Sequence, residues 1–382
     1  MISKYKKSIR FFKKSFPDKR IISLHEPVFF GNEKKYLIES IDSTFVSSVG
    51  KFVDKFESDL SHFTSSKHCV AVVNGTSALH VILKLIGVES DDEVITQSLT
   101  FVATINSIRY LNANPIFIDV EKDSMGMSAD ALQNFLDEFA EIREDGTFNK
   151  KTGKKISACL PMHTFGFIGQ IDSIISICKK WNIPVAEDAA EALGSYYKGK
   201  SAGTFGNMGA FSFNGNKIIT SGGGGAIITN NRTLGTKAKH ITTTAKLKHE
   251  WEFVHDQEAY NYRMPNINAS LAVAQLENFE KIKTNKKKLY EEYINFFFKI
   301  GIELFKIPKH NDWNYWLMSI ILNDKKERDL FLKTTNHFKV KTRPVWHLMH
   351  KLPMFEKFQS DSQKNAVFLY NRIVNIPSGA RV

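Results

Sequence analysis

Lys217 is the side chain of this sequence that is best placed for covalent chemistry. It lies between the apolar segment Phe211–Phe213 and four successive glycines at positions 222–225. A lysine in a crowded site can attack an aldehyde and form a Schiff base, and glycines let the backbone bend around a bulky ligand. Four glycines could equally form a flexible turn, so this segment alone leaves both interpretations open.

Two adjacent acids, Glu187 and Asp188, end the apolar segment 183–186. In an open α/β sheet, ligands bind beyond the carboxyl ends of the strands, and a strand ending here would direct Asp188 toward that crevice. A carboxylate in such a position could keep a proton on a ring nitrogen of a ligand. Taken alone, a solvated acid or a cap for the next helix is the better interpretation of Asp188.

The segment Asn74-Gly75-Thr76-Ser77 combines hydroxyls, free backbone N–H groups and a glycine at the expected start of a helix. These groups suit a phosphate, because a helix N-terminus attracts anions and a glycine lets them approach closely. Serine and threonine are also ordinary N-cap residues, so the segment by itself is a weak signal.

Short β-branched segments alternate with helical ones between residues 68 and 229, and these elements must position the three features above. The alternation predicts an α/β fold in which a mostly parallel sheet has helices on both faces. The expected strands are His68–Val73, Glu93–Thr96, Pro115–Val120, Ile156–Met162, Ile183–Glu187, Gly209–Phe213 and Ala226–Thr229.

A chain of 382 residues exceeds the usual size of a single core, so we expect two packed domains. We assign residues 1–24 to a basic N-terminal helix, 25–255 to a large domain and 256–382 to a smaller α+β domain. Within the last of these, we expect a strand at Trp316–Leu322. The charged segment 137–156 predicts an excursion on the surface.

The order of the chemical features along the chain is what gives them weight. A phosphate-type turn, the aromatic Phe101, Asp188 at a strand end and Lys217 after a further 29 residues follow the order of a pyridoxal phosphate (PLP) enzyme of fold type I. From His25 to at least Phe355, the chain resembles the DegT-like (StrS-type) sugar-nucleotide aminotransferases. The matching segments are Val46–Val53, Asn74–His80, Glu187–Ala192, Phe211–Lys217 and Tyr260–Met264.

The resemblance implies a role for each matching residue. Lys217 would hold PLP through an imine and then move a proton, Asp188 would pair with the pyridinium nitrogen, and Phe101 would stack on the ring. Asn261 would reach the phosphate from the neighbouring subunit, which implies a homodimer with shared active sites. The other implied residues are Gly75, Thr76, Ser77 and Ser212 at the phosphate, Glu191 near the phenolic oxygen, and His163 beside the cofactor. Taken alone, His163 would be interpreted as a core histidine.

The C-terminal part of the resemblance concerns the substrate. Thr342-Arg343-Pro344-Val345-Trp346 is similar to the branch that aminates C4 of UDP-linked 4-keto-6-deoxy sugars, often 2-acetamido ones, for bacterial surface glycans, with glutamate as the implied donor. Arg343 could contact a diphosphate and Trp346 a sugar or base, although both could instead pack within the small domain. The alternatives are a GDP-4-keto-6-deoxymannose 4-aminotransferase of the perosamine type and a 3-keto sugar aminotransferase.

Two rival functions stay open beside this one. The dehydratase branch of the same family carries histidine at the position of Lys217, so Lys217 argues against it. A protein that binds PLP without catalysis is the second rival, and the intact lysine, aspartate and phosphate turn argue against that function.

The net charge of +12 is concentrated at the N-terminus, where residues 1–20 hold eight lysines and arginines against the single acid Asp18. Apolar residues recur there at helical spacing, at Ile2, Tyr5, Ile9, Phe12 and Phe16. This amphipathic helix could dock on its own protein, which we favour, or make a weak contact with an anionic membrane surface. The rest of the chain carries only +5, so we expect no nucleic-acid partner.

The remaining composition bears on localisation and metals. No segment approaches the ~18 apolar residues of a membrane span, and the opening lacks the apolar run of a secretory signal, so we expect a cytoplasmic protein. The cysteines, Cys69, Cys159 and Cys178, are far apart and lack metal-ligand spacing. We therefore expect neither a disulfide framework nor a metal site.

Overall fold

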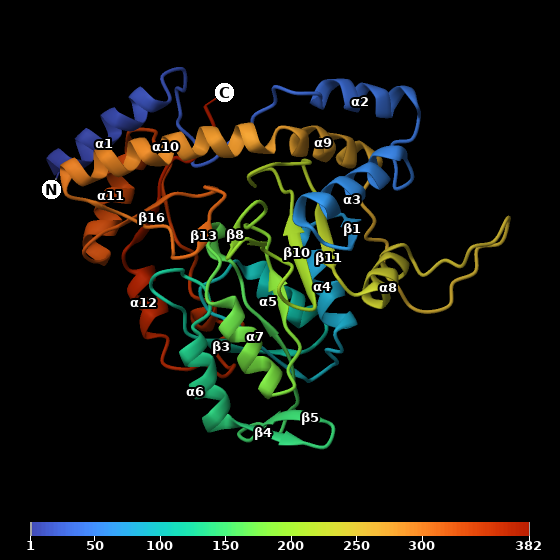
Figure 1. Cartoon of the computed structure of the whole chain (residues 1–382). Coiled ribbons are helices and arrows are strands. Elements are labelled where there is room, and N and C mark those ends of the chain that lie inside the picture. Colours follow the sequence, from blue (N-terminus) through green and yellow to red (C-terminus); the bar gives the residue numbers. More distant parts are fainter. Residues whose placement is uncertain (1, 382) are drawn as a thin grey trace.

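The computed structural model describes residues 2–381, which fold around a central sheet with a smaller sheet near the C-terminus (Figure 1). The α-helices are α1(Ile2–Ser15), α2(Glu33–Asp42), α3(Lys51–Thr64), α4(Gly75–Leu85), α5(Val102–Tyr110), α6(Ala129–Phe139), α7(Ile171–Lys180), α8(Arg232–Thr242), α9(Asn266–Glu277), α10(Phe279–Ile300), α11(Lys325–His337) and α12(Lys364–Tyr370). Short 3-10 turns occupy Thr164–Gly166 and Met349–Lys351.

The central sheet has the strand order β3-β2-β6-β7-β10-β11-β1. Its strands are β1(His68–Val72), β2(Glu93–Gln97), β3(Asn114–Ile118), β6(Ile156–Leu160), β7(Ala186–Asp188), β10(Met208–Ser212) and β11(Gly225–Thr229). Parallel bridges such as Cys159↔Val185 join β6 to β7, and only β11 runs antiparallel to its neighbours. The prediction of a mostly parallel sheet is confirmed.

Neighbouring residues of these strands point into two different cores, which explains their continuous apolar sequences. Val94 and Ala158 pack in one core with residues of α4 and α8. Ile95 and Cys159 pack in another with residues of α6 and α7. Helices therefore cover both faces of the sheet, and the polar ends of its strands are left at the edges.

The C-terminal part contains a second, antiparallel sheet with the strand order β12-β14-β16-β15. Its strands are β12(Glu303–Leu304), β14(Ser319–Ile321), β15(Arg343–Pro344) and β16(Ile373–Asn375). The strand that we expected over Trp316–Leu322 is shorter, because Trp316 N–H donates to Asn314 Oδ1 at 3.0 Å instead of to a neighbouring strand. The Asn314 amide in turn donates to the carbonyl of Glu191, after β7. The domain boundary at 255/256 stays a prediction.

Three short pieces complete the topology. The strands β4(Ala140–Arg143) and β5(Gly146–Asn149) form a hairpin at the lower end of the molecule in Figure 1, within the charged segment expected at the surface. A three-stranded sheet is formed by β8(Tyr196–Tyr197), β9(Lys200–Ser201) and β13(Asn311–Asp312). This small sheet ties the segment after β7 to the C-terminal part.

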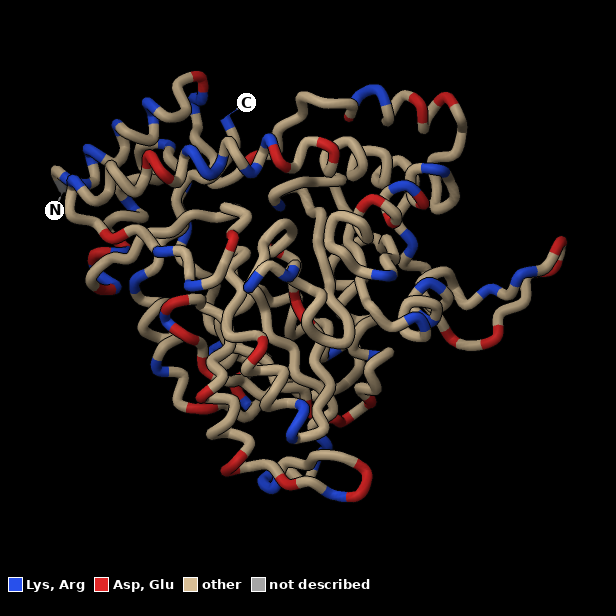
Figure 2. Tube along the Cα trace, in the orientation of Figure 1, with Lys and Arg blue, Asp and Glu red and all other residues tan. Residues whose placement is uncertain are grey.

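The N-terminal helix α1 is docked on the protein itself. Tyr5 and Phe12 are fully buried, Tyr5 Oη donates a hydrogen bond to Glu327 of α11 at 3.1 Å, and Phe11 stacks on Phe296 of α10 at 4.1 Å between ring centroids. The apolar face is thus covered by protein, and its lysines and arginines lie along the rest of the helix (Figure 2). A membrane contact through that apolar face is therefore not supported; the side chain of Ile2 lies outside the described side chains.

Among residues 2–381, no helix combines the length and the apolar character that crossing a bilayer requires.

Candidate active site

A cavity of about 510 Å³ opens beyond the carboxyl ends of β1, β7 and β10 and extends to the C-terminal sheet. Its position agrees with the rule that ligands of open α/β sheets bind beyond the strand ends. The cavity brings together the predicted residues Gly75, Thr76, Phe101, Asp188, Glu191, Ser212, Lys217, Arg343 and Trp346.

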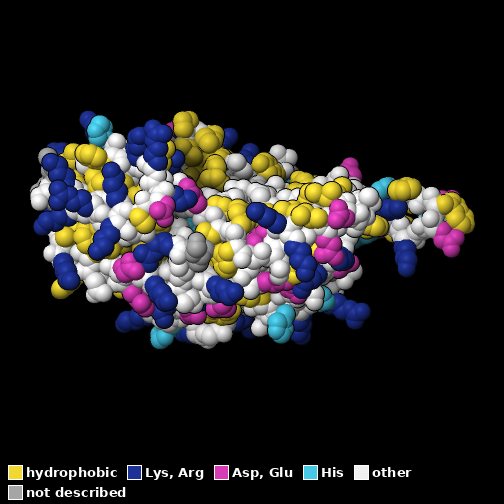
Figure 3. Space-filling view, turned by 90° about the horizontal axis from the view of Figure 1, so that it is seen from above, with side chains coloured by type: hydrophobic (Ala, Val, Ile, Leu, Met, Phe, Trp, Pro, Cys, Tyr) yellow, Lys and Arg dark blue, Asp and Glu magenta, His cyan; other side chains and the backbone are white. Residues whose placement is uncertain are grey.

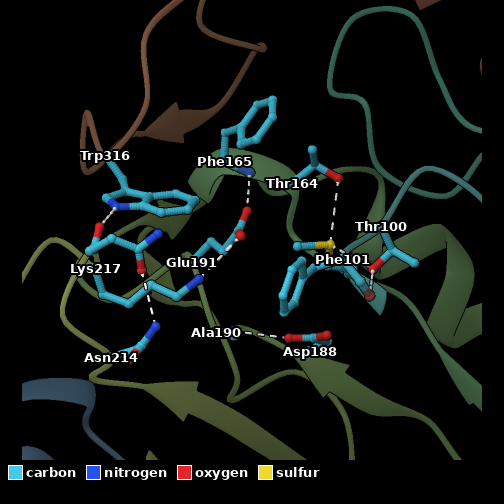
Figure 4. Close-up of polar contacts among 12 residues, drawn as sticks. Thr100, Phe101, Thr164, Phe165, Asp188, Ala190, Glu191, Asn214, Lys217 and Trp316 are labelled. Atoms are coloured by element: carbon cyan, nitrogen blue, oxygen red, sulfur yellow. Dashed lines mark hydrogen bonds and ion pairs between the residues drawn. The ribbon is translucent and has the colours of Figure 1, made fainter. Parts of the chain in front are cut away.

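The two adjacent acids at the end of β7 have separate roles. Glu187 points away from the cavity and accepts hydrogen bonds from the backbone N–H groups of residues 203, 205 and 206. Asp188 lines the cavity and accepts a hydrogen bond from Ala190 N–H at 3.2 Å (Figure 4). It accepts a second one from the Thr104 hydroxyl at 2.7 Å. Burial raises the pKa of Asp188, and these hydrogen bonds offset part of that rise.

Lys217 and Glu191 form an ion pair at the centre of the cavity. Lys217 Nζ lies 3.2 Å from Glu191 Oε1, and the other carboxylate oxygen accepts a hydrogen bond from Phe165 N–H at 2.9 Å (Figure 4). Burial raises the pKa of Glu191 to about 7, although the nearby ammonium of Lys217 acts in the opposite direction. Glu191 can therefore gain or lose a proton near neutral pH.

The start of α4 has the features of a phosphate site. Asn74 Oδ1 caps the helix by accepting a hydrogen bond from Ser77 N–H at 2.7 Å, while the N–H groups of Gly75 and Thr76 belong to the first turn, which lacks acceptors within the helix. A Cβ atom added to Gly75 would lie 2.9 Å from Ser212 Cβ. The absence of that side chain lets the hydroxyls of Thr76 and Ser212 share one corner of the cavity.

Aromatic rings form the opposite wall. Trp346 packs between Phe101 and Phe165, at 6.3 and 4.9 Å between ring centroids. The Trp316 ring lies 4.3 Å from Lys217 Nζ, and its Nε1–H donates to the carbonyl of Asn216 at 2.7 Å (Figure 4). These rings shield the amine of Lys217 from water, and its side chain is only 12% exposed.

Three predicted residues do not line this cavity. Ser77 is buried beneath the first turn of α4. His163 is 2% exposed, and its Nε2 lies 2.9 Å from Glu187 Oε2, so it supports the end of β7 from behind. In this structure its imidazole contacts Glu187 and does not line the cavity, and its direct part in the chemistry stays a prediction. Asn261 is exposed on an antiparallel bridge with Thr243, outside the cavity of its own chain.

Sequence reasoning missed several residues of the site. Thr104 follows Phe101 by one helical turn, and this spacing could have indicated that both face the cavity. The amide of Asn314 donates hydrogen bonds to the carbonyls of Glu191 and Leu193, at 2.8 and 2.9 Å. Asn314, Trp316 and Asn375 come from the C-terminal part, and no local pattern of the sequence connects them with Lys217.

The residues present fit pyridoxal phosphate. The buried Asp188 carboxylate would gain a cation from a protonated ring nitrogen, which would offset the cost of its burial. Phe101 and Ala190 line the cavity and could flank a flat ring, while the α4 start, Thr76 and Ser212 offer donors for a phosphate. Among residues 2–381, no cluster of three or more His, Cys, Asp or Glu could hold a metal ion.

Comparisons with known proteins agree with this site. Residues 30–382 match the DegT/DnrJ/EryC1/StrS aminotransferase family. GDP-perosamine synthase of Vibrio cholerae is 35% identical over 366 residues, which cover 94% of each chain. Two solved structures are similar at 22% identity with a TM-score of 0.84, each over 94% of this chain and 93% of the other: the aminotransferase TlmJ of Streptoalloteichus hindustanus and PseC of Helicobacter pylori, an aminotransferase involved in pseudoaminic acid biosynthesis.

The family match spans nearly the whole chain and includes the cavity with its lysine, its aspartate and its phosphate turn. We conclude that the chain belongs to the DegT/DnrJ/EryC1/StrS aminotransferase family and is a PLP-dependent sugar aminotransferase.

Proposed function

We propose that this enzyme transfers an amino group, with glutamate as donor, to C4 of a nucleotide-linked 4-keto-6-deoxy sugar. The observation that carries the proposal is the arrangement of Lys217, Asp188 and Glu191 around one cavity that Arg343 also lines. The first three groups suit transamination, and a guanidinium suits the diphosphate of a sugar nucleotide.

When bound, PLP supplies an aldehyde that accepts an amine and a pyridinium ring that spreads the negative charge left by removal of a substrate proton. Asp188 would hold the proton on the ring nitrogen. Lys217 Nζ would take the proton from the substrate carbon and hold it for the transfer that completes the half-reaction. Glu191 stays within hydrogen-bond distance of that amine, and Trp316 keeps water away from it.

A homodimer with shared active sites is part of the proposal. Asn261 lies at the base of an arm, residues 244–258, that projects from the molecule and carries apolar side chains at its tip (Figures 1 and 3). Trp251 and Phe253 of this arm are 72% and 75% exposed. A second exposed apolar group lies on α2 and the loop after it, at Ile38, Ile41, Phe45, Val46 and Val49. Surfaces of this kind are typical of subunit interfaces, and Asn261 could then reach the partner's phosphate site.

The similar proteins change one part of the expected substrate, the nucleotide to which the sugar is linked. The sequence motifs favoured UDP-linked 2-acetamido sugars, whereas the relative that is 35% identical is a GDP-perosamine synthase. A second GDP-perosamine synthase, from Escherichia coli O157:H7, is also 35% identical over 366 residues. We therefore favour the GDP-4-keto-6-deoxymannose alternative, in which the amine is added at C4.

The test is to offer the purified enzyme, with glutamate, GDP-, UDP- and dTDP-linked 4-keto-6-deoxy sugars and to identify the products by NMR. We expect a 4-amino sugar from the GDP substrate and none from the Lys217→Ala variant. Amination of the UDP-linked 2-acetamido sugar alone would restore the expectation from the motifs. A 3-amino product, or no product from the whole panel, would contradict the proposal.

A further inference from the structure

Arg343 and Asn375 lie directly opposite each other in the antiparallel C-terminal sheet. They are paired in the antiparallel ladder of β15 and β16, and both line the cavity. Asn375 Oδ1 accepts a hydrogen bond from Ser319 Oγ at 2.7 Å, so its amide N–H₂ is the group left to donate. A guanidinium beside an amide donor makes a compact site for an anionic oxygen.

Of the charged side chains around the cavity, Arg343 is the one suited to bind a substrate anion. The charged side chains that line it are Asp188, Glu191, Lys217 and Arg343. Lys217 is paired with Glu191 and is needed for the chemistry. Among residues 2–381, Arg343 is therefore the cavity cation that stays available for a substrate anion.

Transamination requires two anionic substrates to use this cavity in turn. Glutamate brings carboxylates, and the sugar nucleotide brings a diphosphate. From ordinary bond lengths, the side-chain carboxylate of an extended glutamate lies roughly 5 Å from its reacting carbon, about as far as the first phosphorus lies from C4 across a sugar ring. One anion site at a fixed distance from Lys217 can serve both.

We infer that Arg343 and Asn375 form a single anion site that binds the side-chain carboxylate of the amino donor in one half-reaction and the sugar diphosphate in the other. This inference rests on the proposed function. It adds to that function a reason why the enzyme would select one class of amino acid as the amino donor. A shared site favours dicarboxylic amino acids as donors, and it requires that the two substrates exclude each other.

The test compares Arg343→Gln and Asn375→Ala with the wild type in each half-reaction separately. Loss of a charge-assisted bidentate contact should raise the KM for glutamate and the KM for the sugar nucleotide by roughly 10- to 100-fold in the Arg343→Gln variant. In the Asn375→Ala variant, the KM for glutamate and the KM for the sugar nucleotide should rise by a smaller factor. Arg343→Lys should recover part of the loss, because it keeps the charge without the bidentate geometry.

A binding measurement gives a second readout that does not depend on turnover. Calorimetry with glutarate and with inorganic pyrophosphate should show that each probe excludes the other from the wild-type protein, and that Arg343→Gln weakens both. Lys341→Gln is the matched control, since Lys341 is an exposed cation two residues away that does not line the cavity. It should bind both probes as the wild type does.

The outcomes separate this inference from the function on which it rests. The shared anion site is contradicted if Arg343→Gln weakens only one of the two half-reactions, or if glutarate and pyrophosphate bind at the same time. Either result would leave the proposed aminotransferase activity intact. If the wild type performs neither half-reaction, the proposed function itself fails.

Discussion

Single residues set the proton chemistry of this site through burial. Asp188 and Glu191 both lie in the cavity wall at less than 5% exposure, and burial raises the pKa of both. Their partners differ, because Asp188 is held by a hydroxyl and a backbone N–H whereas Glu191 faces the ammonium of Lys217. Two buried carboxylates therefore serve two purposes: Asp188 would pair with a ring cation, and Glu191 adjusts the charge beside the reactive amine.

Replacing Asp188 by Asn should remove the negative charge that keeps the ring nitrogen protonated. Charge-assisted hydrogen bonds contribute about 1.5–3 kcal/mol, so we expect kcat to fall by roughly 10- to 100-fold or more. Single-turnover kinetics with glutamate measures the effect. An Asp188→Asn variant with wild-type kcat would show that the carboxylate has no part in the chemistry.

The pKa of Glu191 near 7 predicts a pH dependence of stability in the cofactor-free protein. Since the folded pKa lies above the usual 4.5, the folded state holds a proton that the unfolded chain releases, and stability is lost as the pH rises from about 4.5 to 7. Glu191→Gln has no such proton, so its melting temperature should fall less than that of the wild type between pH 5 and pH 7. Parallel curves for the two proteins would contradict this assignment.

At the scale of elements, the site depends on segments that are distant in the sequence. The side chains of Asn314 and Trp316 come from the C-terminal part and donate hydrogen bonds to the carbonyls of Glu191 and of Asn216, the residue before Lys217. Helix α10 supports that segment from behind, since the fully buried Lys286 donates a hydrogen bond to the carbonyl of Trp316 at 3.2 Å. Helix α1 in turn packs on α10 and α11.

The packing of α1 predicts that it contributes to the stability of the C-terminal part. Phe12 is fully buried and contacts Tyr293 and Phe297 of α10. Phe12→Ala should therefore destabilise the protein by about 3–5 kcal/mol, seen as a lower midpoint of denaturation. Lys13→Ala, at the exposed next position, is the control and should change little. Equal midpoints for both variants would mean that α1 is not docked in solution.

At the scale of the whole molecule, two groups of exposed apolar side chains lie near each other, on the arm and on helix α2 with its following loop. The arm at 244–258 and helix α2 lie on the same side in Figure 1, away from α1 and the C-terminal half of α10. Exposed aromatic side chains on a projecting arm are unfavourable in water unless another surface covers them. A second copy of the chain is the partner that this geometry suits.

The arm offers a direct test of the dimer. Trp251→Ser combined with Phe253→Ser should raise the dimer dissociation constant by at least 10-fold, since each ring buries a large apolar area at an interface. Sedimentation velocity over a range of concentrations measures it. Phe298→Ser is the control, because Phe298 is an 85% exposed aromatic residue in the last turn of α10, whose C-terminal end lies on the side of the molecule opposite the arm (Figure 1). A loss of dimer in the control, or none in the arm variant, would contradict the assignment.

The sequence by itself determined the class of fold and the centre of the chemistry. Apolar strands alternating with helices dictate a parallel sheet, and residues that follow those strands, such as Lys217 and Asp188, must gather at one edge of it. The order of these features along the chain, together with the resemblance to the DegT-like family, predicted the cofactor and the roles of Lys217 and Asp188. The sequence also predicted the amphipathic character of α1, but not what covers its apolar face.

Only the tertiary structure decided which side chains near those positions face the cavity. Glu187 and Asp188 are neighbours in the sequence, yet the alternation of a strand sends one to backbone N–H groups and His163 and the other to the cavity. Trp316, Arg343 and Asn375 join the site through contacts between segments more than 90 residues apart, as from Asn216 to Trp316. Such long-range contacts depend on how whole elements pack, and no local spacing in the sequence records that packing.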